Sequence, residues 1–275
     1  MSENTWTVTG PQTIDVDGVR ALKLGIVRGR FDVVTHDENV ATIEVSEISG
    51  DPLSVSVVDG RLEVRHQLHG AHGWFKNLME SVHNSSNNSV VISIALPAGV
   101  DVEAGTVSGD GLVSGLSAHT RLNTVSGSVM ADGTSGDLSV NTVSGEVIAR
   151  NHHGVLTAKS VSGEVTASGE FSHIRANTVS GDLNFDLHGF TRDFGANSVS
   201  GDVTIRLPHD VGVDIVAKSA SGAVVIDALK YAQPGGTVQT IAGPDAKLML
   251  VRTNSVSGKT SIFHGQPSAD PETAR

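Results

Sequence analysis

A short pattern centred on Val-Ser-Gly recurs along this chain at nearly constant spacing. Five copies read NTVSGSV, NTVSGEV, KSVSGEV, NTVSGDL and NSVSGDV, with glycines at Gly127, Gly145, Gly163, Gly181 and Gly201. The spacing is therefore 18 residues three times and then 20, and fainter copies occur at Gly109, Gly222 and Gly258. A fixed period of this length is typical of stacked repeat arrays, in which each unit packs on its neighbours.

The residues around each glycine predict two short strands per repeat. Counted from the glycine, position +4 is always apolar, position +2 is Val or Leu in most copies, and position −2 is Val or, once, Ala220. These positions share parity, so we expect Val, Gly and the later apolar residues to point into one core. Positions −7 and −5 are mostly apolar with the other parity, which requires a bend between them and the glycine. The sequence thus predicts an all-β fold, a parallel β-solenoid of about 18 residues per coil whose coils stack at ~4.8 Å.

Three polar columns should run along this array. Position −4 is mostly Asn, and stacked Asn side chains can form hydrogen bonds from coil to coil. Serine at −1 and an acidic residue at +1 are expected to face outward. They make a candidate surface strip of Ser144, Glu146, Ser162, Glu164, Ser180, Asp182, Ser200 and Asp202. Its acidic part is interpreted as a solvated face, or alternatively as a strip that binds cations or a basic partner.

The rest of the chain divides around this array. Residues 1–97 read as an irregular β-rich part of short strands, either an uneven start of the array or a small domain packed on it. Residues 98–264 form the expected solenoid, with Ala223–Arg252 as one degenerate coil. Residues 265–275, rich in Pro, Asp and Glu, are expected to be a disordered tail.

One stretch within the first part has a helical pattern. Its apolar residues are Trp74, Phe75, Leu78, Met79 and Val82, whose spacing places them on one side of a short amphipathic helix over residues 73–83. We interpret it as a cap that covers the end of the array. The alternative is a docking helix for a partner or a membrane surface, although Lys76 is the only base within it.

Composition excludes several classes of function. The formal net charge is −11, which argues against nucleic acid and against anionic membranes as partners. There is no cysteine, and no apolar run is long enough to span a membrane. The first residues, MSENTWTVTGPQ, do not form a classical signal peptide. We therefore expect a soluble cytoplasmic protein, with surface association only by a non-classical route.

No catalytic constellation is evident in the sequence. It contains no GxSxG nucleophile elbow, no P-loop and no dinucleotide fingerprint. His66, His69 and His72 recur every three residues, but Gly70 and Gly73 oppose a helix there, which favours a polar loop over a metal site. We expect no enzymatic activity, no cofactor and no metal.

The repeated TVSGD/E units, preceded by VVISIALPAGVDVEAGTVSGD, resemble the bacterial DUF4097 family. Its members are described as candidate adhesins or β-strand-repeat proteins. The resemblance covers roughly Val90 to Ile262 well and residues 13–65 loosely. It implies a β-solenoid binding or scaffold module, often linked to cell-envelope sensing, and it brings no catalytic motif.

The function expected from the sequence is a non-enzymatic binding or scaffold role with a protein partner. An envelope-associated or stress-sensing system would suit it. The alternative is a self-assembling structural protein like the bactofilins, which also have short β coils, so a homo-oligomer is possible. A polysaccharide-active solenoid enzyme is disfavoured because the chain has one Tyr and two Trp to serve as sugar platforms.

Overall fold

The computed structural model describes residues 4–66, 88–231 and 236–265. These residues form 24 strands in one continuous sheet and contain no helix. The first twelve strands are β1 (Asn4–Val8), β2 (Gln12–Asp17), β3 (Ala21–Ile26), β4 (Arg28–His36), β5 (Val40–Ser49), β6 (Leu53–Val58), β7 (Arg61–His66), β8 (Ser89–Pro97), β9 (Asp101–Thr106), β10 (Asp110–Ser114), β11 (Thr120–Thr124) and β12 (Val129–Asp132). The others are β13 (Ser135–Thr142), β14 (Val147–Ser160), β15 (Val165–Thr178), β16 (Leu183–Leu187), β17 (Asp193–Ser198), β18 (Val203–Leu207), β19 (Gly212–Ser219), β20 (Val224–Ile226), β21 (Leu229–Tyr231), β22 (Thr237–Ala242), β23 (Leu248–Ser255) and β24 (Thr260–His264).

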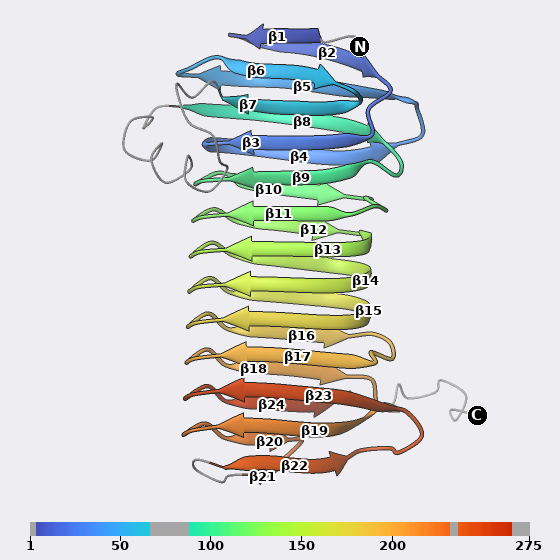
Figure 1. The fold of residues 1–275 in the computed structure, drawn as a ribbon, viewed down its shortest axis with the longest axis vertical. Coiled ribbons are helices and arrows are strands. Elements are labelled where there is room, and N and C mark those ends of the chain that lie inside the picture. Colours follow the sequence, from blue (N-terminus) through green and yellow to red (C-terminus); the bar gives the residue numbers. More distant parts are fainter. Residues whose placement is uncertain (1–3, 67–87, 232–235, 266–275) are drawn as a thin grey trace, which may run out of the picture.

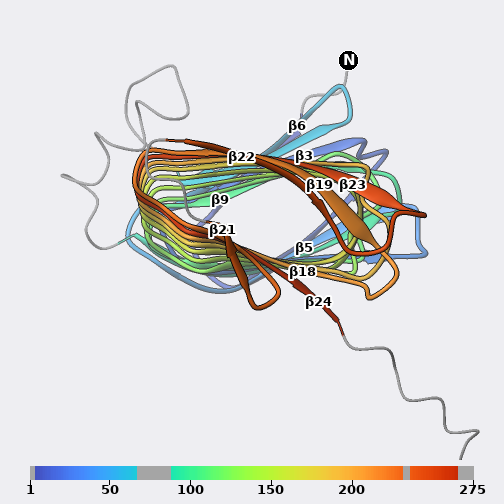
Figure 2. The ribbon, with the colours of Figure 1, turned by 90° about the horizontal axis from the view of Figure 1, so that it is seen from below.

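The sheet winds into stacked, flattened coils, as expected (Figures 1 and 2). In each central coil one strand runs along one broad side, turns at the Val-Ser-Gly unit, and continues as a second strand along the other side. Successive coils pair in parallel with an 18-residue offset, for example Thr120 with Leu138 and Val129 with Val147. β14 and β15 each bend around the opposite corner, so that their two halves lie on different sides.

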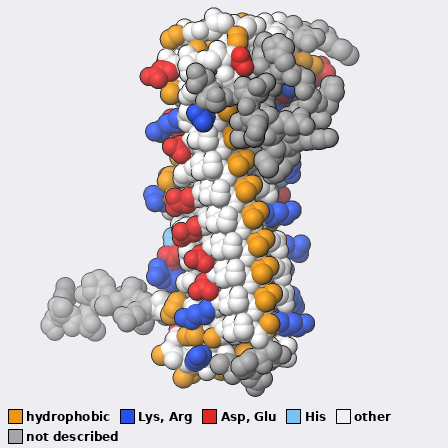
Figure 3. All heavy atoms as spheres, turned by 90° about the vertical axis from the view of Figure 1, so that its left-hand side faces the viewer, with side chains coloured by type: hydrophobic (Ala, Val, Ile, Leu, Met, Phe, Trp, Pro, Cys, Tyr) orange, Lys and Arg blue, Asp and Glu red, His pale blue; other side chains and the backbone are white. Residues whose placement is uncertain are grey.

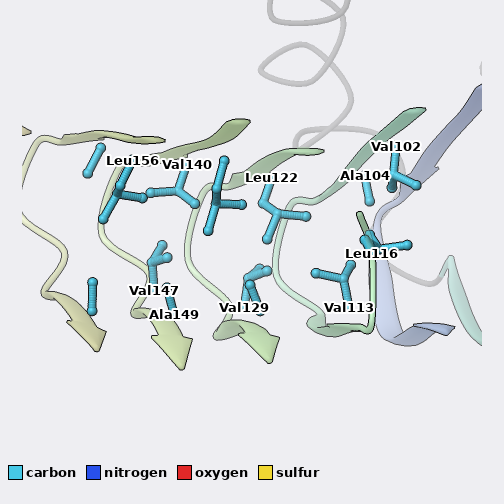
Figure 4. Close-up of a cluster of buried hydrophobic side chains, with 14 of the residues drawn as sticks. Val102, Ala104, Val113, Leu116, Leu122, Val129, Val140, Val147, Ala149 and Leu156 are labelled. Atoms are coloured by element: carbon cyan, nitrogen blue, oxygen red, sulfur yellow. The ribbon is translucent and has the colours of Figure 1, made fainter. Parts of the chain in front are cut away.

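The core lies between the two broad sides, where alternate residues of each strand point inward. Leu122, Val140 and Leu156 come from one side, and Val129 and Val147 come from the other (Figure 4). The apolar positions −5 and +4 are buried throughout the array. Both predicted core columns are therefore confirmed. Their small side chains suit the narrow space between the sides.

The two ends of the stack depart from chain order. β3 and β4 lie between the β7–β8 coil and the β9–β10 coil. At the other end β23 lies between β17 and β19, and β24 lies between β18 and β20. The last coil in sequence is thus inserted before the end of the stack.

The expectation that Ala223–Arg252 forms one degenerate coil is therefore wrong. Its residues instead supply the terminal hairpin β20–β21, the antiparallel strand β22, which pairs with β19, and the start of the parallel strand β23. Antiparallel strands also end the N-terminal part, where β6 pairs with β7 and β1 with β6. The helix predicted over residues 73–83, with Trp74, Phe75, Leu78, Met79 and Val82, lies outside the described residues. The predicted tail beyond Gly265 also lies outside the described residues.

Candidate functional site

The repeated turn is organised by a buried hydroxyl at position −3. Each first strand of a central coil ends at this Thr or Ser, which occupies the inward direction. The Thr124 hydroxyl donates to the Gly127 carbonyl at 3.0 Å, and Thr142 donates to Gly145 at 2.8 Å. In other coils the same hydroxyl accepts from the glycine N–H, as Thr178 does from Gly181. This local bond closes the turn and satisfies a buried backbone group.

In the copies from Val125 to Val256 the valine at −2 consequently points outward, and the prediction that it fills the core is wrong there, whereas Val107 of the first copy is buried. Parity from Leu122 continues through Thr124, so Val125 faces the opposite way. The strand ends before the valine, and the direction of the chain reverses in the next two residues. Along the chain, the inward-facing positions are therefore the apolar residues of the first strand, the hydroxyl at −3 and, after the turn, the apolar residues of the second strand. Because all eight copies carry Thr or Ser at −3, the sequence contained the signal needed to find this arrangement.

The glycine column is a place of close backbone approach, as the sequence indicated. A Cβ added at Gly163 would lie 2.0 Å from the Gly145 carbonyl oxygen and 3.0 Å from the Thr142 methyl group. A Cβ added at Gly127, Gly181 or Gly201 would likewise lie 1.8 to 2.0 Å from the carbonyl oxygen of the glycine in the preceding coil. No other residue fits without moving the backbone, so this column sets the distance between coils.

The outward valines form an apolar column, here called the valine ladder: Val125, Val143, Val161, Val179, Val199 and Val256. The last four are 46%, 48%, 47% and 52% exposed, respectively. Figure 3 shows the ladder as a continuous line of apolar side chains along the narrow edge of the stack. Contiguous exposed apolar side chains of this kind mark interaction surfaces more often than scattered ones.

The predicted serines lie beside the ladder, and their hydroxyls already have partners. Ser144, Ser162, Ser180 and Ser200 are exposed, but each donates to the carbonyl of the valine in the preceding coil, at 3.1 to 3.4 Å. The valine carbonyl therefore faces the next coil while its side chain faces solvent. These bonds connect the turns of successive coils. Because each hydroxyl already donates its proton, it can only accept a further hydrogen bond.

The predicted acidic residues lie beyond the serines and are all exposed: Glu146, Glu164, Asp182 and Asp202. The shorter side chains bond along the column, because Asp182 accepts from the backbone N–H of Asp202 at 2.9 Å, and Asp202 accepts from Lys259 N–H at 2.7 Å. Glu164 instead accepts from the Asn184 amide at 2.8 Å. None of the four forms a salt bridge within the described residues, so their charges face solvent.

The other flank of the ladder carries bases and the predicted Asn column. Asn141 donates to Asn123 at 2.9 Å, and Asn254 donates to Asn197 at 2.8 Å, which confirms the ladder of amides. An open groove of about 490 Å³ lies here against Val143 and Val161. Its lining includes Arg121 and Lys159 among other residues of four adjacent coils. Arg121, Lys159 and Arg175 are exposed and form no salt bridge in the described part of the chain.

The ladder thus separates a flank with exposed bases from a flank with exposed acids, as Figure 3 shows. Such a surface has shape, apolar contact area and a charge direction, but it has no paired acid and base. Among residues 4–66, 88–231 and 236–265, no group of three metal-ligating side chains lies together. No helix long and apolar enough to cross a membrane occurs in the same residues.

One histidine of the array, His152, lies in the interior. His152 is fully buried at the corner opposite the turns, bonds Thr134 through Nδ1 at 2.9 Å, and contacts the Phe171 ring. Desolvation by burial is the main cause that lowers the pKa of His152 below its usual value of 6.5. Its neutral form is therefore part of the packed corner, far from the ladder.

One of three similar solved structures supports the fold. A proposed lipid-binding protein from Parabacteroides distasonis superposes with a TM-score of 0.54 at 15% identity, over 94% of this chain and 97% of that one. A proposed cell adhesion protein from Clostridium sporogenes has a TM-score of 0.31 at 15% identity, over 93% and 100% of the two chains. A proposed adhesin from Bacteroides fragilis has a TM-score of 0.45 at 12% identity, over 93% and 97%.

These identities are low, so the first of them shows a shared fold and nothing about activity. No curated protein matches the chain. The sequence pattern of the Toastrack DUF4097 family matches residues 23–262, which contain the whole stack from β3 into β24. The name agrees with the architecture of regularly spaced, stacked turns. The chain belongs to the Toastrack DUF4097 family.

Proposed function

We propose that this protein is a non-enzymatic β-repeat scaffold that binds a protein partner along the valine ladder. The observation that carries this proposal is the row of half-exposed valines, at coil spacing, between a basic and an acidic flank. Burial of this row would supply apolar contact energy, and the flanks would fix the direction of the partner.

The chemistry of the partner follows from the shape of the ladder. Its valines repeat at about 4.8 Å, close to the 5.4 Å rise of one helical turn. A narrow amphipathic helix can therefore place one apolar side chain per turn against successive valines over a few coils. Its basic side would face Glu164 and Asp182, and its acidic side would face Lys159 and Arg175.

The absence of a role in catalysis is part of the proposal. The serine hydroxyls beside the ladder donate to valine carbonyls, and His152, whose pKa is lowered by burial, is enclosed in the core at the opposite corner. A nucleophile needs a base within hydrogen-bond distance, and the ladder region offers none among the described residues. A partner held by shape and charge fits the same surface better than a substrate does.

The test is a selection of peptides on the purified protein. A displayed library of amphipathic helical peptides is selected on the wild type and counter-selected on the triple variant Val161→Asp, Val179→Asp and Val199→Asp. We expect enriched peptides whose affinity falls at least tenfold on this variant. The matched control places three charges at the opposite corner of neighbouring coils, as Ser172→Asp, His188→Asp and His209→Asp, and should keep full affinity.

Two outcomes would overturn the proposal. One is enrichment of peptides that bind the ladder variant as well as the wild type. The other concerns lipid, since one related structure is described as lipid-binding. If the wild type floats with vesicles of phosphatidylcholine and phosphatidylserine and the ladder variant does not, the ladder contacts a lipid surface rather than a protein.

A further inference from the structure

Two adjacent strands on the basic flank of the ladder place four hydrogen-bond donors at the corners of a small square. β14 supplies Thr157 and Lys159, and β15 supplies Arg175 and Asn177. Thr157 pairs in register with Arg175, and Lys159 pairs with Asn177. Neighbouring strands lie about 4.8 Å apart, and alternate residues of one strand lie about 6.6 Å apart. The four side chains point away from the core, so one small ligand can reach them all; we call this group the donor square.

The side-chain donors of this square have no acceptor in residues 4–66, 88–231 and 236–265. Asn177 Oδ1 accepts from the Asn197 amide at 2.8 Å, so Asn177 Nδ2 is directed toward the preceding coil, where Lys159 lies. Lys159 and Arg175 form no salt bridge, and the Thr157 hydroxyl forms no hydrogen bond, within the same residues. An acceptor placed over the square would therefore meet donors that no protein group uses.

The two cations of the square are not balanced by neighbouring acids. Lys159 and Arg175 lie on adjacent strands, where like charges repel each other. The positions that pair with the square in the two adjoining coils are all uncharged: Ser139, Asn141, Gly195 and Asn197. A Cβ added at Gly195 would have the Ile174 carbonyl oxygen, at 3.9 Å, as its one neighbour within 4 Å, so the surface beside Arg175 is open. In a chain of net charge −11, two unbalanced bases beside an open position favour an anion.

A second set of the same residue types shows how these donors behave when the protein itself supplies the acceptors. Lys218 of β19 pairs in register with Asn254 of β23, which follows Arg252 by two residues. There Arg252 forms a salt bridge with Asp193 at 3.3 Å, and the Asn254 amide donates to Asn197 at 2.8 Å. An arginine and an asparagine two residues apart, next to a lysine, are thus bonded within the protein at one place and lack protein acceptors at the other.

We propose that the donor square binds an oxyanion, the carboxylate or phosphate group of a side chain on the bound partner. The Arg175 guanidinium can donate two parallel hydrogen bonds to such a group, and Lys159 and Asn177 can donate to it from the neighbouring corners. The square lies two residues before Val161 and Val179 of the ladder in the same coils. The oxyanion would therefore belong to a partner seated on the ladder, which rests on the function proposed above, whereas binding of a free anion does not depend on that function.

The test is a titration of the full chain with inorganic phosphate and, separately, with acetate, at constant ionic strength so that general screening does not change. The readout is the NMR signals of the Asn177 side-chain amide and the Arg175 Nε–H. We expect both signals to shift and to saturate. Saturation with both anions assigns a carboxylate as sufficient, and saturation with phosphate alone assigns a phosphorylated side chain.

Two variants and a matched control decide whether the square is the site. Lys159→Gln and Arg175→Gln should each weaken anion binding roughly fivefold or more, because each removes a charged donor. Lys218→Gln removes the same charge at the equivalent position of the bonded set and should leave the affinity unchanged. Circular dichroism verifies that each variant is folded. Shifts that do not saturate with either anion, or an affinity unaffected by both variants, would overturn the proposal. A failed peptide selection on the ladder would leave this titration unaffected, so the two proposals fail separately.

Discussion

The inner and outer sides of the repeated turn differ in how closely their side chains are packed. On the inner side, Thr142 and Gly145 are buried and bonded to each other, and the next glycine meets the Gly145 carbonyl directly. On the outer side, Val161 and Val179 are half exposed. Repetition in a sequence therefore does not by itself show whether a column of residues is needed for packing or is available for contact with a partner. The Thr/Gly column and the valine column both repeat, but only the Thr/Gly column leaves no space for a larger side chain.

The largest effect should come from the inner side. Gly163→Val forces a side chain against the Gly145 carbonyl oxygen and the Thr142 methyl group. We expect a loss of ~2 kcal/mol or more in the free energy of unfolding, because the coils must separate locally. Equilibrium urea unfolding measures this loss. An unchanged midpoint would show that the coils are not held at the distance that the glycine column requires.

The opposite corner should respond to pH. Burial lowers the pKa of His152, so the folded state favours the neutral ring. The stabilisation is complete above about pH 6.5 and is lost as the pH falls below that value toward the folded-state pKa, by up to about 1.4 kcal/mol per pH unit.

His152→Leu should therefore flatten the dependence of stability on pH between 6.5 and 5. The measurement is urea unfolding at several pH values. Val199→Ser, a change on the outer side of the turn, serves as the control and should keep the wild-type slope. If His152→Leu and the wild type have parallel curves, His152 does not titrate as its burial requires.

A smaller effect is expected from the hydroxyl that closes the turn. Thr142→Val keeps the shape but removes the donor to the Gly145 carbonyl, which is buried. We expect a loss of about 1 to 2 kcal/mol. Thr142→Ser keeps the hydroxyl, as Ser160 does naturally in the next coil, and should cost clearly less. Equal losses for the two variants, measured by thermal unfolding, would show that the hydroxyl does not stabilise the turn.

The stacked coils could be predicted because their causes are local and periodic. Leu122, Val140 and Ala158 recur at one offset from the glycine, and their burial follows from strand parity. The direction of the valine could not be obtained from parity alone. It depends on where the strand ends, and the strand ends at a hydroxyl that bonds to the glycine of the turn.

The ends of the stack were beyond prediction for another reason. β23 carries the same kind of strand sequence as β17 and β19, so nothing in its residues says which neighbours it meets. The order is decided by the connections, since β22 occupies the terminal edge and the chain must return to pair elsewhere. The Val-Ser-Gly unit at Gly258 predicts a coil but does not predict its position in the stack.

The smallest effect on stability belongs to the outer side. Val179→Ser replaces a half-exposed apolar side chain of the ladder by a polar one. We expect a change of about 0.5 kcal/mol in unfolding free energy, because surface substitutions away from special features rarely exceed that. The same variant should lower the affinity of any peptide selected on the ladder. A loss of stability as large as that of Thr142→Val would mean that the ladder is structural.

The most direct measurement compares two positions in one turn, Val161→Ser and Gly163→Ala. They lie two residues apart, one pointing to solvent and the other against the preceding coil. Urea unfolding should give a loss for Gly163→Ala of about 2 kcal/mol, roughly four times that of Val161→Ser. Equal losses, or a larger loss for Val161→Ser, would contradict the division between an inner side that builds the stack and an outer side that is free to bind.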